Sequence, residues 1–380
     1  MALNLDSGDY KIFRDGFRKF VQKEIAPHYL QWEKEGRIPR EIWQKAGENG
    51  YLCPWVDEKY GGTGAGFEYS VIIAEELARA GTLILFPLHS DIVVPYIHSY
   101  GTEAQKQKWL PGCVSGDLIT AVAMTEPDAG SDLAAIKTTA VRQGNHYVLN
   151  GTKTFISNGL LADLVIVACK TNPGAVPPHR GISLLVVERG TPGFSRGRRL
   201  EKLGLHSQDT AELIFEDCRV PAENLLGQEG MGFLYLMEKL QQERLVCAIM
   251  AQGLAERMLD YTVEYCRNRT IFGRPISGFQ HNAFKLAEMA TEIELGRAFL
   301  DSLVEKHLAG RRIVKEVSMA KWWITEMANR VAYNCLQLHG GYGYMEEYPI
   351  CRDYRDVRIF TIFAGTNEVM KTIISKEMGL

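Results

Sequence analysis

Two short polar motifs near the middle of the chain carry the residue types best suited to chemistry. The first, Ala123–Asp132, reads AMTEPDAGSD, and the second, Lys153–Gly159, reads KTFISNG. A proline disfavours helix in the residue before it, and a glycine lets backbone N–H groups approach a ligand closely. If the second motif is a strand, Phe155 and Ser157 face the same side. Such residues could bind a flat ring, because they offer an aromatic side chain to stack on it and a hydroxyl and backbone N–H groups to form hydrogen bonds with it.

Each motif alone is more often structural than functional, because TEP and GSD are common turn sequences and SNG is common in loops. Three motifs in the last third of the chain change this balance. They are Arg269–Gly273 (RTIFG), Gln337–Tyr344 (QLHGGYGY) and Ile362–Glu368 (IFAGTNE). In order and spacing, the set resembles the acyl-CoA dehydrogenase family over nearly the whole chain, and its long-chain branch most closely.

Composition limits the function further. The 380 residues allow two or three domains with a large core, and the net charge of −3 gives no electrostatic reason to bind nucleic acid or an anionic membrane. The eight cysteines show no C-x-x-C pair, so we expect neither zinc nor a disulfide framework. Without a signal-like N-terminus or a membrane-length apolar run, we expect a bacterial cytoplasm, or the mitochondrial matrix for a processed eukaryotic chain.

Hydrophobic periodicity divides the chain into three parts. Helical spacing runs through Phe13–Ile25 and again around Val71–Leu77. From Leu118, short β-rich runs are separated by Gly144-Asn145 and Asn150-Gly151, which is typical of hairpins. The expected strands are Thr138–Val141, Tyr147–Leu149, Leu164–Cys169 and Ile182–Val187. The expected later helices are Phe233–Arg267, Gln280–Ala309, Ile313–His339 and Asn367–Lys376.

We therefore predict an α+β fold of the acyl-CoA dehydrogenase type. It has an N-terminal α-helical domain (1–119), a middle antiparallel β domain for flavin and substrate (120–228) and a C-terminal helical bundle (229–380). No G-x-G-x-x-G follows a strand, which argues against a Rossmann dinucleotide site.

The resemblance implies an α,β-dehydrogenation of acyl-CoA thioesters to trans-2-enoyl-CoA, with FAD as cofactor and an electron-transfer flavoprotein as acceptor. Long-chain or methyl-branched substrates are expected. A carboxylate takes the α proton while the β hydrogen leaves as hydride. The reaction needs a base beside Cα and hydrogen-bond donors at the thioester oxygen.

The position of the base is the main departure from the family pattern. Many relatives carry it in Tyr-Glu-Gly-Thr, but the matching segment here has Ala364 in place of the glutamate. Glu243 offers a replacement, because it shares a helical face with Leu236, Leu240 and Met250, and burial would raise its pKa. Long-chain and isovaleryl relatives place their base on this helix. Without the resemblance, a surface glutamate paired with Lys239 would be the better interpretation.

The resemblance assigns further roles near the base. The backbone N–H of Ala364 would donate to the thioester oxygen, and Gly365 would let the acyl chain come close. Ser131, Leu240, Arg244 and Gly365 are the expected substrate contacts. His339 has no nucleophile or metal partner in the sequence, so we expect a structural role for it.

The resemblance also assigns contacts along the whole length of FAD. At the ring end they are Val122, Met124, Thr125, Gly130, Ser131, Phe155 and Ser157, and at the adenosine pyrophosphate end Thr366 and Glu368. Arg269, Phe272, Gln280, Gln337 and Gly341 match residues that reach the FAD of a neighbouring subunit, so a homotetramer is expected. Alternatively, Arg269 is an ordinary surface arginine, and Gln337–Gly341 is a helix end with a glycine cap.

Two other functions fit the same fold. One is an acyl-CoA oxidase or flavin monooxygenase that uses oxygen. The other is a catalytically inactive flavoprotein that serves as an assembly partner; Ala364 favours it and Glu243 opposes it.

Overall fold

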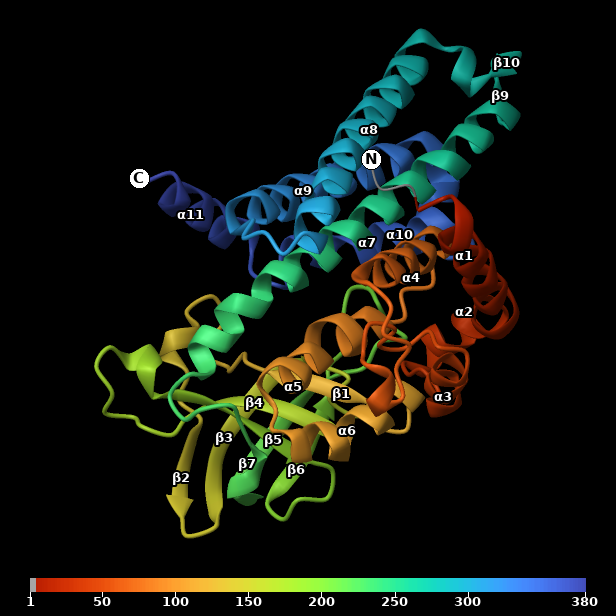
Figure 1. Cartoon of the computed structure of the whole chain (residues 1–380). Coiled ribbons are helices and arrows are strands. Elements are labelled where there is room, and N and C mark those ends of the chain that lie inside the picture. The colour runs from red at the N-terminus through yellow and green to blue at the C-terminus, as the bar shows by residue number, and fades with distance from the viewer. Residues whose placement is uncertain (1–4) are drawn as a thin grey trace.

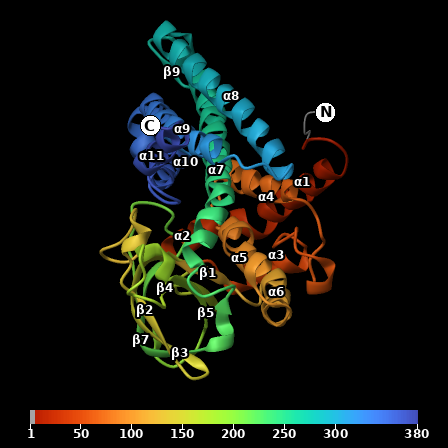
Figure 2. The ribbon, with the colours of Figure 1, turned by 60° about the vertical axis from the view of Figure 1, so that its left-hand side comes forward.

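The computed structural model describes residues 5–380 and arranges helices, a sheet and then helices again (Figure 1). The sheet lies at one end of the molecule, and the C-terminal helices extend away from it (Figure 2). The predicted α+β fold is confirmed. The proposed domain boundaries, at 119/120 and 228/229, fall in the connections before β1 and before α7.

The N-terminal part is helical throughout. Its helices are α1 (Gly8–Phe20), α2 (Ala26–Glu35), α3 (Arg40–Glu48), α4 (Phe67–Ala80), α5 (Val94–Tyr100) and α6 (Glu103–Ser115). The helical spacing predicted for Phe13–Ile25 is confirmed, although Val21–Ile25 forms a π-helical segment between α1 and α2. A second π-helical segment, η3 (Leu88–Val93), leads into α5 and contacts α7.

The middle part is a sheet in the order β6-β7-β3-β2-β4-β5-β8, with β1 beside β4. The strands are β1 (Thr120–Ala123), β2 (Thr139–Gln143), β3 (His146–Ser157), β4 (Leu164–Lys170), β5 (Ile182–Glu188), β6 (Phe194–Arg199), β7 (Thr210–Pro221) and β8 (Leu225–Leu226). Pairing is antiparallel except where β4 meets β1 and β2.

One predicted turn in the sheet is wrong. Gly144-Asn145 does connect β2 to β3, but Asn150-Gly151 lies inside β3, which is therefore much longer than the predicted Tyr147–Leu149. The register with β7 shifts between Leu149 and Gly151, which is a bulge. A Cβ on Gly151 would come within 2.4 Å of Thr138 Oγ1, so glycine here allows close approach inside a strand.

The C-terminal part is a bundle of long helices, each within two residues of its predicted bounds at either end. These are α7 (Gly232–Asn268), α8 (Gln280–Leu308), α9 (Val314–His339) and α11 (Asn367–Glu377), with the short α10 (Pro349–Val357) before α11. A small hairpin of β9 (Thr270–Ile271) and β10 (Arg274–Pro275) joins α7 to α8 at the far end of the molecule from the large sheet (Figure 1).

Helix α7 forms the centre of this bundle because α4, α8 and α9 all pack against it. Every residue from Glu243 to Ala255 is buried. A helix surrounded on all sides is usually apolar there. Glu243 and Arg244 nevertheless stand at the start of this buried stretch, so their side chains need partners or a cavity beside the helix.

Candidate active site

A cavity of about 510 Å³ lies where the sheet meets the C-terminal helices. It is bordered by β1 and the loop after it, the end of β3, η3, the first half of α7 and the turn before α11. The predicted site residues that line it are Val122, Met124, Thr125, Gly130, Ser131, Phe155, Ser157, Leu240, Glu243, Arg244, Ala364 and Gly365. Segments far apart in the sequence therefore meet at one cavity.

A buried ion pair holds the two polar motifs of this cavity together. Lys153, in the second motif, is fully buried and donates to Glu126 Oε1 (2.8 Å) and to the carbonyl of Met124 (2.9 Å), both in the first motif. Backbone N–H groups of Lys137 and Thr138 donate to the same carboxylate. Burial would raise the pKa of Glu126, but Lys153 and these donors outweigh burial and lower it. The carboxylate form is thus the stable one.

Phe155 and Ser157 both line the cavity, as predicted, but not through a regular pleat. The register of β3 with β7 shifts between Lys153 and Ile156, and Phe155 has a φ of 60°. This left-handed conformation is uncommon for an aromatic residue. Phe155 is 68% exposed as a residue at the edge of the cavity, and Ile156 lines the cavity as well.

Glu243 lies on α7, and its carboxyl group lines this cavity. It is 5% exposed, and its Oε1 accepts a 2.7 Å hydrogen bond from the Tyr96 hydroxyl on α5. Burial raises the pKa of Glu243 to about 7, against the opposing effects of Tyr96 and the charge of Arg244. The alternative of a surface pair is wrong, because Lys239 instead donates to Ser99. A carboxyl with a pKa near neutrality suits a general base.

Arg244 is an almost fully buried guanidinium that faces the same cavity. Within residues 5–380 it has no hydrogen-bond or ion-pair partner, and its Nε is buried without one. Burial lowers the pKa of Arg244, while the charge of Glu243 opposes this change. Buried charged groups normally have partners, so a guanidinium of this kind is well placed to bind an oxygen of a ligand.

The turn at Ala364 and Gly365 borders the cavity with backbone in an unusual conformation. Ala364 has a φ of 54° and Gly365 a φ of 90°, both in the left-handed region. The fully buried Lys321 on α9 donates to the Gly365 carbonyl (2.6 Å), and the Thr366 hydroxyl caps α11 by accepting from the N–H of Val369 (3.4 Å). These contacts fix a conformation that an alanine adopts only at a cost.

Thr366 and Glu368 do not line this cavity, although Gly365 and Val369 beside them do. Arg269, Gln337 and Gly341 lie instead in a second cavity of about 440 Å³, which also includes His339. The Nδ1 of His339 donates to the Cys335 carbonyl (2.8 Å), and its ring stacks on Tyr265, which fits a structural role.

The second cavity is remote from the first within one chain. Arg269 follows the end of α7, 26 residues after Glu243, which corresponds to roughly 39 Å along a helix axis. Phe272 is 92% exposed in the β9–β10 turn, and Gln280 is exposed at the start of α8; neither lines a cavity with the other predicted residues. The structure therefore places seven of the predicted FAD contacts at the first cavity and three at the second, while Thr366, Glu368, Phe272 and Gln280 line neither.

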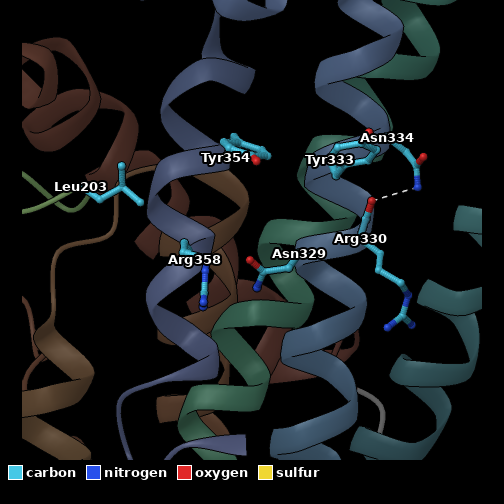
Figure 3. Close-up of a pocket in the computed structure, with 7 residues that line it drawn as sticks. All are labelled: Leu203, Asn329, Arg330, Tyr333, Asn334, Tyr354 and Arg358. Carbon is cyan, nitrogen blue, oxygen red and sulfur yellow. Dashed lines mark hydrogen bonds between the residues drawn. The ribbon is translucent and has the colours of Figure 1, made fainter.

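A third and larger hollow, of about 670 Å³, lies on α9 and α10 (Figure 3). Its lining residues are Leu203, Asn329, Arg330, Tyr333, Asn334, Tyr354 and Arg358. These seven residues include none of the predicted site residues and no aspartate or glutamate. Size alone therefore does not identify the site.

Among residues 5–380, no group of three or more His, Cys, Asp or Glu residues is arranged to hold a metal ion. No helix in that range has the length and apolar character needed to cross a membrane.

Comparison with known proteins agrees with this geometry. The chain is 48% identical to the mitochondrial long-chain specific acyl-CoA dehydrogenase of Mus musculus, over 98% of this chain and 87% of that protein. The chain belongs to the acyl-CoA dehydrogenase family. Models of the N-terminal, middle and C-terminal domains of acyl-CoA dehydrogenases match residues 7–117, 121–218 and 230–379.

Two bacterial acyl-CoA dehydrogenases are also similar over nearly their full length. One, from Bacillus subtilis, is 40% identical over 96% of both chains. The crystal structure of the other, from Geobacillus kaustophilus, is 65% identical, covers all of both chains and has a TM-score of 0.99. The predicted family and enzyme class are confirmed: the chain is an oxidoreductase acting on the CH–CH bond of acyl-CoA.

Members of the family depend on FAD, which confirms the predicted cofactor. The first cavity fits the ring end of that group. The exposed ring of Phe155 offers a stacking surface, and a Cβ built on Gly130 meets no atom within 4 Å, so backbone borders open space there. The Ser157 hydroxyl lies on the same cavity.

Several residues of the site were not foreseen from the sequence. The apolar wall of the cavity includes Leu85, Leu88, Ile92, Phe233 and Met237. Tyr96, Lys153 and Lys321 do not line the cavity themselves but form hydrogen bonds to Glu243, Glu126 and the Gly365 carbonyl, respectively. Nothing in the sequence around a single tyrosine or lysine predicts such a hydrogen bond. Lys153 and Glu126 do, however, belong to the two polar motifs described above.

The structural role of the Lys153–Glu126 ion pair can be tested by removing one partner. Lys153→Met leaves the buried Glu126 carboxylate without its cation, so we expect it to lower the free energy of unfolding by about 3–5 kcal/mol. FAD should also be released more easily. Urea unfolding and the flavin absorbance retained after gel filtration measure the two effects.

Lys137→Met is the matched control, because Lys137 pairs with Asp128 (2.7 Å) on the surface. Its loss should be much smaller. Equal losses for the two variants would contradict the role assigned to the buried pair.

Proposed function

We propose that this enzyme dehydrogenates long-chain or methyl-branched acyl-CoA thioesters, with Glu243 as the base. The observation that carries this proposal is the desolvated carboxyl of Glu243, which shares one cavity with the Ala364–Gly365 turn and the flavin-facing motifs. Relatives that are 48% and 38% identical are named as long-chain and isovaleryl enzymes, which supports the two substrate classes.

In the proposed reaction, the thioester lies with Cα beside Glu243, which takes the α proton. The backbone N–H of Ala364 donates to the thioester oxygen, where negative charge develops as that proton leaves. When bound, FAD supplies the acceptor for the β hydride. Val122, Met124, Thr125, Gly130, Ser131, Phe155 and Ser157 would hold its ring end, and Thr366 and Glu368 its pyrophosphate end.

Arg244 is the second charged group that we assign to substrate. Its unpartnered guanidinium would bind an oxygen on the thioester or CoA side. Ser131, Leu240 and Gly365 would contact the rest of the acyl-CoA. The apolar wall contributed by η3 and α7 suits a hydrocarbon chain, because such surface is stabilised by excluding water.

We further propose an electron-transfer flavoprotein as the acceptor and a cytoplasmic location, or the mitochondrial matrix for a processed chain. A chain in a solved structure titled as the electron transferring flavoprotein of Acidaminococcus fermentans is 38% identical with a TM-score of 0.94, which supports the first point.

The proposed assembly is a homotetramer in which Arg269, Phe272, Gln280, Gln337 and Gly341 complete the FAD site of a neighbouring subunit. The separation between the two cavities within one chain supports this arrangement. Arg269 would pair with phosphate oxygens as a bidentate donor.

The base is tested by Glu243→Gln. The amide keeps the shape of the side chain but cannot accept the proton, so reduction of FAD by substrate should slow by roughly 10²–10⁴ while the protein stays folded and yellow. Anaerobic stopped-flow absorbance measures the rate. Glu238→Gln, an exposed change on the same helix, should have no such effect. Near-normal reduction by Glu243→Gln would exclude it as the base.

The assembly is tested by Arg269→Glu. A repulsive charge would replace the phosphate donor, so both FAD retention and tetramer formation should weaken. Arg267→Glu reverses a neighbouring exposed charge that lies outside the second cavity and serves as the control. Sedimentation at matched protein concentration gives the oligomeric state. A monomer that holds FAD tightly would contradict the proposed shared site.

One experiment separates this function from the two rivals. Palmitoyl-CoA, octanoyl-CoA and isovaleryl-CoA are added to the yellow protein without oxygen and then in air. Bleaching of the flavin without rapid peroxide formation in air supports the dehydrogenase. Rapid peroxide identifies an oxidase, and no bleaching with any thioester leaves the inactive partner.

A further inference from the structure

The base candidate receives its hydrogen bond from a residue outside the two motifs and outside α7. Tyr96 stands on α5, which packs against α7, and it is completely buried. Its hydroxyl lies 2.7 Å from Oε1 of Glu243. The two residues are 147 positions apart in the sequence. The contact therefore exists only because the N-terminal helices dock beside the C-terminal bundle.

The two oxygens of the Glu243 carboxyl have different surroundings. Oε1 accepts the hydrogen bond from Tyr96. Oε2 has no hydrogen-bond partner among residues 5–380, and it is not fully buried. Since Glu243 lines the cavity, Oε2 is the oxygen that a substrate can reach. A hydroxyl that holds one oxygen also restricts rotation of the carboxyl plane, which reduces the freedom lost when the substrate binds.

We infer that Tyr96 is a positioning residue for the base: its hydroxyl holds Oε1, favours the carboxylate form and leaves Oε2 facing the α carbon of the substrate. The inference rests on the proposed role of Glu243. It assigns Tyr96 no contact with substrate or FAD.

The donor remains a donor over the range in which the base titrates. Burial raises the pKa of Tyr96 well above its ordinary value, and the neighbouring carboxylate raises it further. The hydroxyl thus stays protonated while Glu243 changes charge. A hydrogen bond to a carboxylate favours the charged form, so Tyr96 opposes the effect of burial on Glu243.

Other charged groups near the cavity do not replace this contact. They are Asp132 after β1, Arg244 on α7, Lys321 on α9 and Lys376 on α11, together with Asp91 on η3, which accepts from Trp55. Arg244 also favours the carboxylate, through its charge rather than through a hydrogen bond. Tyr96 is therefore the one hydrogen-bond donor to Glu243 within residues 5–380.

The test compares Tyr96→Phe with Tyr100→Phe. Tyr100 lies one turn further along the same helix, stacks on Tyr235 and has no hydrogen bond to Glu243. The rate of anaerobic FAD reduction by palmitoyl-CoA is measured against pH in both variants and in the unchanged protein. The pKa of the Glu243 carboxyl is measured separately by infrared difference spectroscopy, with Glu243→Gln as the reference that lacks this group.

For Tyr96→Phe we expect the acid limb of the rate profile and the infrared pKa to move together to higher pH by about one to two units. The direction follows because the base works when deprotonated, and loss of the donor favours the protonated form. Below the limb, reduction should slow by roughly 10- to 100-fold. Tyr100→Phe should leave the limb in place. A shift of the limb is not expected from a merely structural loss of the hydroxyl.

A second substitution keeps the test decisive if Tyr96→Phe fails to retain FAD. Placing 3-fluorotyrosine at position 96 preserves the size of the ring and makes the hydroxyl more acidic, so it donates more strongly. The acid limb should then move to lower pH.

An unchanged limb in these variants, while Glu243→Gln still slows reduction, would overturn the role of Tyr96 and leave the base in place. Near-normal reduction by Glu243→Gln would overturn the base and, with it, the inference.

Discussion

The removal of one carboxyl group from water is the constraint on which the site depends. Glu243 lies at the start of the stretch of α7 that is buried on all sides, where a charged side chain is costly unless something compensates for it. Burial raises its pKa to about 7, while Tyr96 and Arg244 keep the carboxylate accessible near neutral pH. Without these two neighbours, the same burial would raise the pKa of Glu243 further and favour the protonated form, which cannot accept a proton.

The rest of the fold brings the two polar motifs, the Ala364–Gly365 turn and this carboxyl to one cavity. The sheet contributes two motifs that are locked together by Lys153 and Glu126, and the C-terminal bundle contributes a left-handed turn held by Lys321. Each support is a buried lysine that reaches across from another segment. Lys153 and Lys321 thus hold the backbone segments that carry the lining residues, so the lining side chains need no partner inside the cavity.

Much of this architecture could be predicted from the sequence, for reasons that differ between elements. The long helices were predicted closely because apolar spacing persists over many turns. Strand β3 was predicted too short, because Asn150-Gly151 looks like a turn but forms a bulge. Glu243 was predicted as the base from the family resemblance, because the glutamate expected at Ala364 is missing; its apolar helical face alone did not exclude a surface glutamate.

The supporting contacts could not be predicted in the same way. Tyr96 and Glu243 are separated by 147 residues, and Lys321 and Gly365 by 44, so only the packing of the helices reveals them. Consecutive residues on a helix point about 100° apart, yet Glu243 and Arg244 both line the cavity, because it extends around that side of α7. Local patterns carry no information about such contacts.

If Glu243 is the base and position 364 borders the same α carbon from the turn before α11, a carboxylate should work from either position. The most direct test moves the carboxylate from position 243 to position 364. The rate of anaerobic FAD reduction is measured in the double variant Glu243→Gln/Ala364→Glu. We expect partial recovery over Glu243→Gln with straight-chain thioesters, and less with methyl-branched ones, because the added side chain crowds the cavity. No recovery with straight chains, despite intact FAD and substrate binding, would mean that the two positions do not reach the same α carbon.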